Sequence, residues 1–194
     1  MCGRYTLADG PTDEEFTWIC EMIRKNNSEA PIPTGEVAPS LRAPVLTSPN
    51  TPALLTWGYP GIRGKGLLIN ARAETAENKP TFRQSVARRR CAVPCTGFFE
   101  WDKSKHKYLF TLPSQPLFYL AGLYELFSGE PRFVILTTAA NNSICDIHDR
   151  MPVILDGNKR ERWLGDSTAA SRILHGESPM LERRAGTPEQ TSLW

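Results

Sequence analysis

Residues 97–138, GFFEWDKSKHKYLFTLPSQPLFYLAGLYELFSGEPRFVILTT, carry the clearest secondary-structure pattern in the chain. Runs of aromatic, aliphatic and β-branched residues alternate there with residues that favour turns, such as Asp, Ser, Pro and Gly. Short runs separated by turns are typical of an antiparallel sheet. The pattern predicts strands over residues 97–101, 107–112, 117–124 and 132–138.

A helix is expected on the N-terminal side of these strands, over residues 12–24. Thr12 and Glu15 have the spacing of a capping box, and apolar residues follow at positions i, i+3, i+4 and i+7. This apolar face includes Cys20, which is therefore expected in the core.

A second helix is expected over residues 80–89, where Phe82 and Val86 lie one helical turn apart. Between the two predicted helices, prolines recur from Pro31 to Pro60, which excludes long helices and favours short strands joined by turns. The combination of these helices with the predicted sheet indicates the α+β fold class.

Length and charge limit the possible functions. With 194 residues the chain is long enough for one domain. A net charge of +2 argues against a uniformly basic, DNA-coating surface but leaves room for a local basic groove.

The cysteine count bears on the cellular compartment. The chain has five cysteines, an odd number, and no apolar leader, so we expect reduced thiols in the cytoplasm. No apolar run approaches the length of about 20 residues that a membrane span needs.

The C-terminal segment differs in composition from the rest of the chain. After Asp166 the residues are mainly Ser, Thr, Glu, Pro and Arg, with few apolar anchors. We therefore expect a single domain over residues 1–165, followed by a polar tail over residues 166–194 that is either disordered or draped over the surface.

Cys2 is the first candidate for chemistry, because loss of Met1 would give it a free α-amine beside its thiol. The amine titrates at about pH 8 and the thiol at about pH 8.5, so a useful fraction of each is nucleophilic at neutral pH. The amine can form a Schiff base with an aldehyde, and the thiol can then close a five-membered thiazolidine ring. The alternative is a small thiol that only packs in the core.

Asn70 and Arg72 stand at the end of an apolar run, residues 67–69. In an extended segment, side chains two residues apart point to the same face. Asn70 can both donate and accept hydrogen bonds, and Arg72 offers a planar fork suited to phosphate. The alternative is an Asn in a turn beside a surface Arg.

Glu100 lies between Phe99 and Trp101. A carboxyl group in an aromatic stretch is expected to be partly desolvated, which raises its pKa toward that of a useful general acid or base. The alternative is a strand-edge carboxylate in water, because side-chain alternation places both rings on the face opposite Glu100.

Cys91 and Cys95, with His106 beyond them, could suggest zinc. A fourth ligand at suitable spacing is absent, and the strand pattern places both cysteines on one apolar face. We therefore expect no metal and no cofactor. Residues 102–107 fit a solvated hairpin tip, with contact to phosphate as the alternative.

His148 is followed by Asp149, Arg150 and a Met-Pro strand start, a pattern that fits a loop presenting an imidazole at a strand edge. Histidine is the usual proton shuttle at neutral pH. The alternative is a histidine with a purely structural role.

Taken together, these motifs resemble those of the SRAP family, the SOS response-associated peptidases. The resemblance spans residues 2 to 155 and implies a mainly antiparallel, barrel-like β-sheet core with flanking helices. It rests on these segments in this order: Cys2-Gly3-Arg4-Tyr5, Trp57-Gly58, and residues 69–75, 90–94, 97–101, 121–124, 135–138 and 148–152.

The resemblance implies a sensor of abasic sites in single-stranded DNA, which forms a covalent DNA–protein crosslink in the DNA damage (SOS) response and shields the lesion from strand cleavage. Carried over by position, Cys2 would bond the aldehyde of the ring-opened deoxyribose through a thiazolidine. Asn70 would hold the N-terminal residue or the sugar oxygen. Glu100 would move protons during ring opening and imine formation, and His148 would act as acid or base in crosslink formation and reversal.

The resemblance also implies DNA contacts. Arg4 and Arg72 would bind phosphates around the lesion, while Trp57 and Trp101 would stack on exposed bases or wedge beside the gap. The family usually has an Asn shortly before an Ala-Pro pair, whereas this chain has Glu36. A carboxylate is unfavourable near DNA phosphates, so the contact made by this segment stays open.

Two alternatives remain. The family name implies an enzyme of the cysteine peptidase type. Such a hydrolase would act chiefly on its own Met1-Cys2 peptide bond, in addition to crosslinking, lyase-like chemistry on DNA. A non-catalytic module for single-stranded DNA would explain the Arg and Trp residues without Cys2. The expected partner is single-stranded DNA with abasic sites and not a membrane. We expect a monomer in the cytoplasm, associated with the nucleoid if the cell is bacterial.

Overall fold

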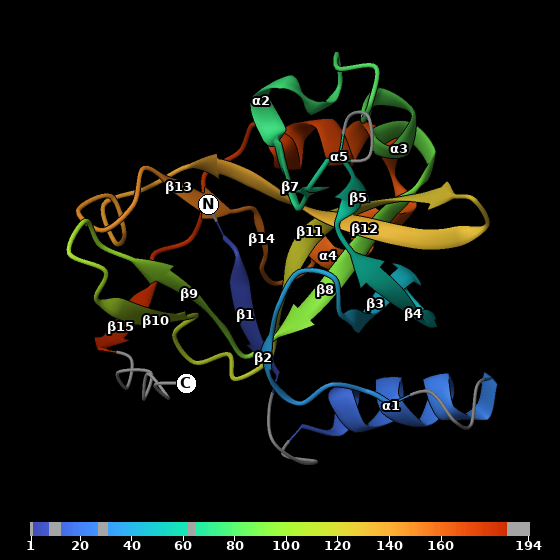
Figure 1. The fold of residues 1–194 in the computed structure, drawn as a ribbon, viewed down its shortest axis with the longest axis horizontal. Helices are drawn as coiled ribbons and strands as arrows, with labels where there is room; N and C mark the ends of the chain where they lie inside the picture. The colour runs from blue at the N-terminus through green and yellow to red at the C-terminus, as the bar shows by residue number, and fades with distance from the viewer. Residues whose placement is uncertain (1, 8–12, 27–30, 62–64, 186–194) are drawn as a thin grey trace.

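The computed structural model describes residues 2–7, 13–26, 31–61 and 65–185 (Figure 1). In chain order its elements are β1 (Arg4–Leu7), α1 (Glu14–Asn26), β2 (Gly35–Val37), β3 (Arg42–Ser48), β4 (Thr51–Trp57), β5 (Tyr59–Pro60), β6 (Leu67–Leu68), β7 (Asn70–Arg72), α2 (Ala73–Ala76), α3 (Arg83–Arg88), β8 (Arg90–Cys95), β9 (Gly97–Trp101), β10 (Lys107–Thr111), β11 (Phe118–Phe127), β12 (Glu130–Ala139), β13 (Arg150–Pro152), β14 (Ile154–Leu155), α4 (Lys159–Gly165), α5 (Ser167–Leu174) and β15 (Glu182–Ala185).

A closed ring of strands forms the centre of the molecule. Its strands pair in the order β12, β4, β3, β8 and β11, and β11 pairs with β12 to close the ring. Most neighbours are antiparallel, whereas β12 runs parallel to β4 and, further along, to β7. The α+β class and the mainly antiparallel, barrel-like core are therefore confirmed.

The ring strands are buried on both faces. In β8, Cys91 and Val93 belong to an apolar cluster that also contains side chains of a second sheet. Ala92 belongs to another apolar cluster, which also contains side chains of the helices. Figure 1 shows α1 on one side of the ring and α2, α3 and α5 on the other. Gly122 on β11 allows close packing, because a Cβ there would lie 2.7 Å from the Cys91 sulfur.

The second sheet consists of β15, β10, β9, β1 and β2 in that order, with antiparallel neighbours. Tyr5 on β1 pairs with Phe98 on β9, and both rings are buried against the ring of strands. Arg4 pairs with Phe99, and these side chains lie on the opposite, partly exposed face. The sheet therefore has a core face and a face that remains open to solvent.

The strands predicted over residues 97–138 are present as β9 to β12. The predicted N-terminal helix is α1, and its cap is Asp13, whose Oδ1 accepts the backbone N–H of Glu15 at 2.9 Å and of Phe16 at 3.1 Å. Thr12, expected at this cap, lies outside the described residues. The second predicted helix is confined to α3. None of the helices in the described ranges is both long enough and apolar enough to cross a membrane.

The segment predicted as a tail is structured as far as it is described. Helix α5 buries Ala169, Ala170 and Leu174, and β15 pairs with β10. Small Ala side chains let this helix pack closely with few large apolar residues. The folded unit therefore extends past the predicted boundary at residue 165 to Ala185, whereas residues 186–194 lie outside the described part of the chain.

Candidate functional site

Cys2 lies just before β1, and its side chain is fully buried. The residue packs in the apolar cluster that contains Tyr5 and Trp57, and its sulfur lies 3.8 Å from the Arg4 carbonyl oxygen. Burial, and then the negative charge of Glu100, raises the pKa of the Cys2 thiol well above its usual value. The thiol is therefore packed and protonated at neutral pH in the chain that retains Met1.

Asn70, at the start of β7, connects Cys2 to the ring of strands. Its Nδ2 donates to the carbonyl oxygen of Cys2 at 3.2 Å and to that of Ile135 on β12 at 3.4 Å. Its Oδ1 is buried and accepts no hydrogen bond from the described residues. This side chain thus holds the backbone of Cys2 and keeps one acceptor available beside it.

Glu100, on β9, is buried, with only 2% of its surface exposed. Burial raises the pKa of Glu100, and His148, when its ring is protonated, partly opposes this shift. The alternative of a carboxylate in water is therefore wrong. Phe99 and Trp101 lie on the opposite face, as side-chain alternation predicts, so the desolvation comes from the core and not from these two rings.

His148 lies at the end of the loop between β12 and β13. Its backbone N–H donates to the carbonyl oxygen of Ile144 at 3.0 Å, and its Nδ1 accepts the backbone N–H of Arg150 at 3.0 Å. A ring nitrogen that accepts a hydrogen bond carries no proton, so the neutral ring is protonated at Nε2. Asp149 Oδ1 also lies 3.0 Å from Nδ1, and it forms an ion pair there only when the ring is charged.

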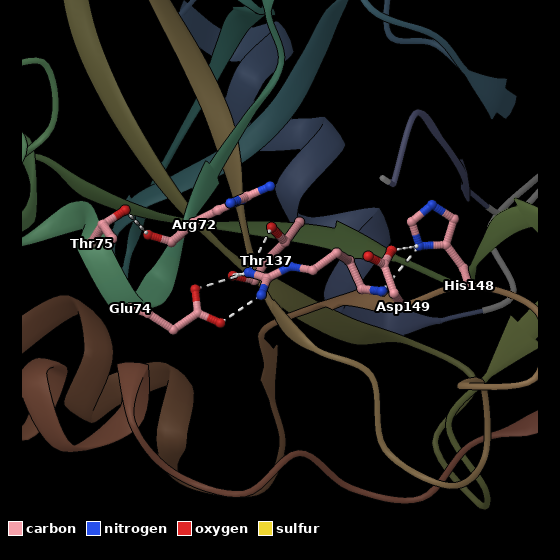
Figure 2. Close-up of polar contacts among 7 residues, drawn as sticks. Arg72, Glu74, Thr75, Thr137, His148 and Asp149 are labelled. Carbon is pink, nitrogen blue, oxygen red and sulfur yellow. Dashed lines mark hydrogen bonds and ion pairs between the residues drawn. The ribbon is translucent and has the colours of Figure 1, made fainter.

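Arg150 and Glu74 form an ion pair that the sequence did not reveal. Arg150 Nη1 and Nη2 donate to the two carboxylate oxygens of Glu74 at 2.6 and 2.9 Å, and Nη2 also donates to the Thr137 carbonyl oxygen at 2.6 Å. Figure 2 shows Glu74 and Thr137 at one end of this network and His148 with Asp149 at the other. The only sequence signal was that both partners fall in motif segments, residues 69–75 and 148–152.

The residues expected to contact phosphate lie at the surface. The Arg72 side chain is exposed, at the end of β7, and it lies above the network in Figure 2. Arg4 is 41% exposed and forms an ion pair with Glu36. Trp101, expected to stack on bases, is partly exposed. These positions are accessible to a strand of DNA.

Trp57 does not fit the role that the sequence suggested. Its side chain is fully buried, its Nε1 donates to the Ile69 carbonyl oxygen at 3.0 Å, and its ring stacks on Phe133 with the centroids 6.2 Å apart. A fully buried ring offers no face to a base, so the expectation of base stacking by Trp57 is wrong. The ring instead packs in the core, where its centroid lies 5.3 Å from that of Tyr5.

Cys91 and Cys95 are fully buried on one face of β8, as the strand pattern predicted. Burial raises the pKa of both thiols. Among the described residues, no group of three or more His, Cys, Asp or Glu side chains is arranged to hold a metal ion. Residues 102–107 form the tip of the β9–β10 hairpin, where Asp102 accepts from His106.

The structure thus assembles the four predicted catalytic candidates around the start of β1. Asn70 is hydrogen-bonded to Cys2, while Glu100 acts electrostatically on Cys2 and His148 on Glu100. A thiol, an amide, a carboxyl group and an imidazole have the functional groups that addition to a carbonyl requires.

Comparisons with known proteins identify the family and the fold of the chain. A family model described as SOS response associated peptidase (SRAP) matches residues 1–185. The chain is 37% identical over 187 residues to the Abasic site processing protein YoqW of Bacillus subtilis (strain 168), covering 84% of this chain and 80% of that protein. It is 33% identical over 178 residues to the Abasic site processing protein YedK of Escherichia coli (strain K12), covering 84% and 79%. Its fold matches a crystal structure of a protein from Bacteroides thetaiotaomicron with a TM-score of 0.77 and 25% identity, over 97% of this chain and 93% of that one.

Proposed function

Because the chain belongs to the SOS response associated peptidase (SRAP) family, we propose that it processes abasic sites in DNA. The observation in this chain that supports the proposal is the hydrogen bond from Asn70 to Cys2 beside the buried carboxyl group of Glu100. An electrophilic aldehyde is the chemical feature that distinguishes a ring-opened abasic site from intact DNA, and an N-terminal cysteine is suited to capture it.

The finer proposal is a covalent crosslink between Cys2 and an abasic site in single-stranded DNA. Hydrolysis of the Met1-Cys2 peptide bond frees the α-amine of Cys2. The amine adds to the aldehyde of the ring-opened deoxyribose, and loss of one water molecule gives an imine. The Cys2 thiol then adds to the imine carbon, its proton passes to the nitrogen, and a thiazolidine ring forms. The aldehyde that would lead to strand cleavage is thereby consumed.

Burial of the thiol supports this order of events. A protonated thiol is a weak nucleophile, so the amine reacts first with the aldehyde. Ring closure is then intramolecular, and the short distance between thiol and imine offsets the weak nucleophilicity. The same burial argues against a general cysteine peptidase, which needs a reactive thiolate to attack unrelated peptides.

Glu100 and His148 would carry the protons. Because burial raises the pKa of Glu100, this carboxyl can protonate the hydroxyl that leaves as water during imine formation. His148 would accept and return protons as the sugar ring opens and as the crosslink reverses. The Oδ1 of Asn70, which accepts no hydrogen bond from the described residues, would hold either the amine of Cys2 or a sugar hydroxyl. Arg4, Arg72 and Trp101 would bind the flanking strand.

The test is denaturing gel electrophoresis after mixing the protein with a single-stranded oligonucleotide that contains one abasic site. We expect a slowly migrating band that survives denaturation, that is absent with the undamaged strand, and that is lost in Cys2→Ala. Intact-mass spectrometry must first confirm that Met1 has been removed. If such protein gave no band, the proposal would be wrong, and retained non-covalent binding would then favour a simple DNA-binding module.

A further inference from the structure

Glu36, on β2, binds two cations on the open face of the second sheet. Its Oε1 accepts from Arg4 Nη1 at 2.9 Å, and its Oε2 accepts from Lys107 Nζ at 2.5 Å. Arg4 lies on the neighbouring strand β1, but Lys107 lies on β10, so the contact between Lys107 and Glu36 spans β9 and β1. One carboxylate at the edge of the sheet therefore pairs with two cations, one from the neighbouring strand and one from a more distant strand.

The same face carries aromatic rings. The Lys107 ammonium lies 4.2 Å from the centre of the Phe99 ring and 5.7 Å from that of Trp101. Rings on which bases can stack, with cations that can hold phosphates, are the two components of surfaces that bind single-stranded nucleic acid. Glu36 is the acidic group in this arrangement, and a carboxylate that bridges two cations makes the same contacts as a phosphate would.

We propose that Glu36 is a specificity-determining residue that occupies Arg4 and Lys107 in place of DNA phosphates and so weakens non-covalent binding to undamaged strands. The inference rests on the abasic-site function proposed above. A strand that uses these two cations must first displace a carboxylate that is tethered beside them. Undamaged DNA has only such reversible contacts, whereas a strand with an abasic aldehyde is also retained by the bond to Cys2.

The carboxylate therefore acts unequally on the two kinds of strand. It shortens the residence of the protein on intact DNA, which is in large excess, and leaves more protein free for lesions. A neutral side chain at this position would remove one ion pair from each of the two cations and strengthen binding to every strand. Glu36 would then raise selectivity at the expense of affinity.

The test compares Glu36→Gln with Glu125→Gln, which causes the same change in net charge. Glu125 on β11 also forms an ion pair with an arginine, Arg89, and its side chain is 28% exposed, as is that of Glu36. Fluorescence anisotropy with a labelled, undamaged single strand gives Kd over a series of salt concentrations. We expect Glu36→Gln to lower Kd roughly three- to tenfold at low salt. The slope of log Kd against log salt should steepen by about 0.7 for each additional DNA phosphate that the freed cations neutralise.

Equal Kd values and equal slopes for the two variants would overturn the role of Glu36. Glu36→Asp, which keeps the charge, should bind more like the unmodified protein than Glu36→Gln does. In gels with an abasic strand and excess undamaged competitor, Glu36→Gln should lose more crosslinked product than Glu125→Gln. If no protein formed a crosslink, the proposed function would fail, and the anisotropy result would still decide whether Glu36 restrains binding to DNA.

Discussion

The side-chain amide of Asn70 donates a hydrogen bond to the carbonyl oxygen of Cys2, with 3.2 Å between the two atoms and 68 positions between the residues. The same amide nitrogen lies 3.4 Å from the Ile135 carbonyl oxygen on β12. Asn70 on β7 therefore links the backbone of the proposed nucleophile to the central ring of strands. This contact makes the position of Cys2 depend on the folded core.

Asn70→Asp replaces the donor with an oxygen while keeping the shape of the side chain. An acceptor would then face the carbonyl oxygens of Cys2 and Ile135 in a buried site, so we expect the free energy of unfolding to fall by about 1–3 kcal/mol. Crosslinking should slow at least roughly tenfold because Cys2 is no longer held in position. Thermal unfolding and gel time courses measure the two effects. Asn142→Asp, at an exposed position, is the control, and similar losses there would contradict the explanation.

The two tryptophans should respond in opposite ways. Trp57→Phe removes the hydrogen bond to Ile69 and some core volume, so the free energy of unfolding should fall by about 1–2 kcal/mol while the folded protein keeps its DNA affinity. Trp101→Ala should leave stability nearly unchanged but weaken binding to single-stranded DNA by about 1–3 kcal/mol, the usual contribution of one stacked base. Denaturant unfolding and anisotropy distinguish the two results. A loss of affinity in folded Trp57→Phe would disagree with its position in the core.

Glu100 should make stability depend on pH. Its pKa is raised in the folded state by burial, so between the unfolded and folded pKa values the folded protein binds more protons than the unfolded chain. Stability must then fall as pH rises through this window. Glu100→Gln removes the cost of the buried carboxylate, and we expect it to be about 1 kcal/mol more stable than the unmodified protein at about pH 8. It should also lose crosslinking. Unfolding curves at several pH values provide the check, and identical pH dependence in both proteins would show that Glu100 is not responsible.

Thiol reactivity should follow burial. Cys145 is exposed, whereas Cys2, Cys20, Cys91 and Cys95 are buried. A thiol-specific reagent should therefore modify Cys145 rapidly in the native protein that retains Met1, and the buried cysteines only after unfolding. Cys145→Ser should remove the rapid phase. Peptide mapping by mass spectrometry identifies the modified residue, and rapid labelling of Cys2 in protein that retains Met1 would contradict the structure.

Glu74 should affect His148 through Arg150. The hydrogen bond from Arg150 lowers the pKa of Glu74, and the backbone N–H of Arg150 donates to the ring of His148. Glu74→Gln weakens the ion pair that holds Arg150, and through it the hydrogen bond from Arg150 to the His148 ring. Crosslinking at saturating DNA should therefore become roughly tenfold slower. Stability should change by less than about 1 kcal/mol because the Glu74 carboxylate is partly exposed.

The matched control for that experiment is Glu77→Gln, which removes a carboxylate paired with His175. It should leave crosslinking unchanged. A higher Kd for DNA in Glu74→Gln, without a lower saturating rate, would mean that the ion pair serves DNA binding and does not position His148.

The strands of residues 97–138 were predictable because alternation and turn residues act over a few positions. The same rule placed Phe99 and Trp101 opposite Glu100, but alternation does not say which face becomes buried. The packing of the second sheet on the ring of strands decides that, and it buries the carboxyl group. Trp57 was misjudged for the same reason, since an aromatic residue suits both a core and a stacking surface.

The sequence was sufficient to predict the α+β class, helix α1 and strands β9 to β12, because secondary structure depends largely on local residues. The contacts of Asn70 with Cys2, of Glu74 with Arg150 and of Glu36 with Lys107 became visible only in the tertiary structure. Each joins residues far apart in the chain, and the packing of the two sheets determines which of them meet. That packing also sets the desolvation of Cys2 and Glu100, since burial depends on all the surrounding elements at once.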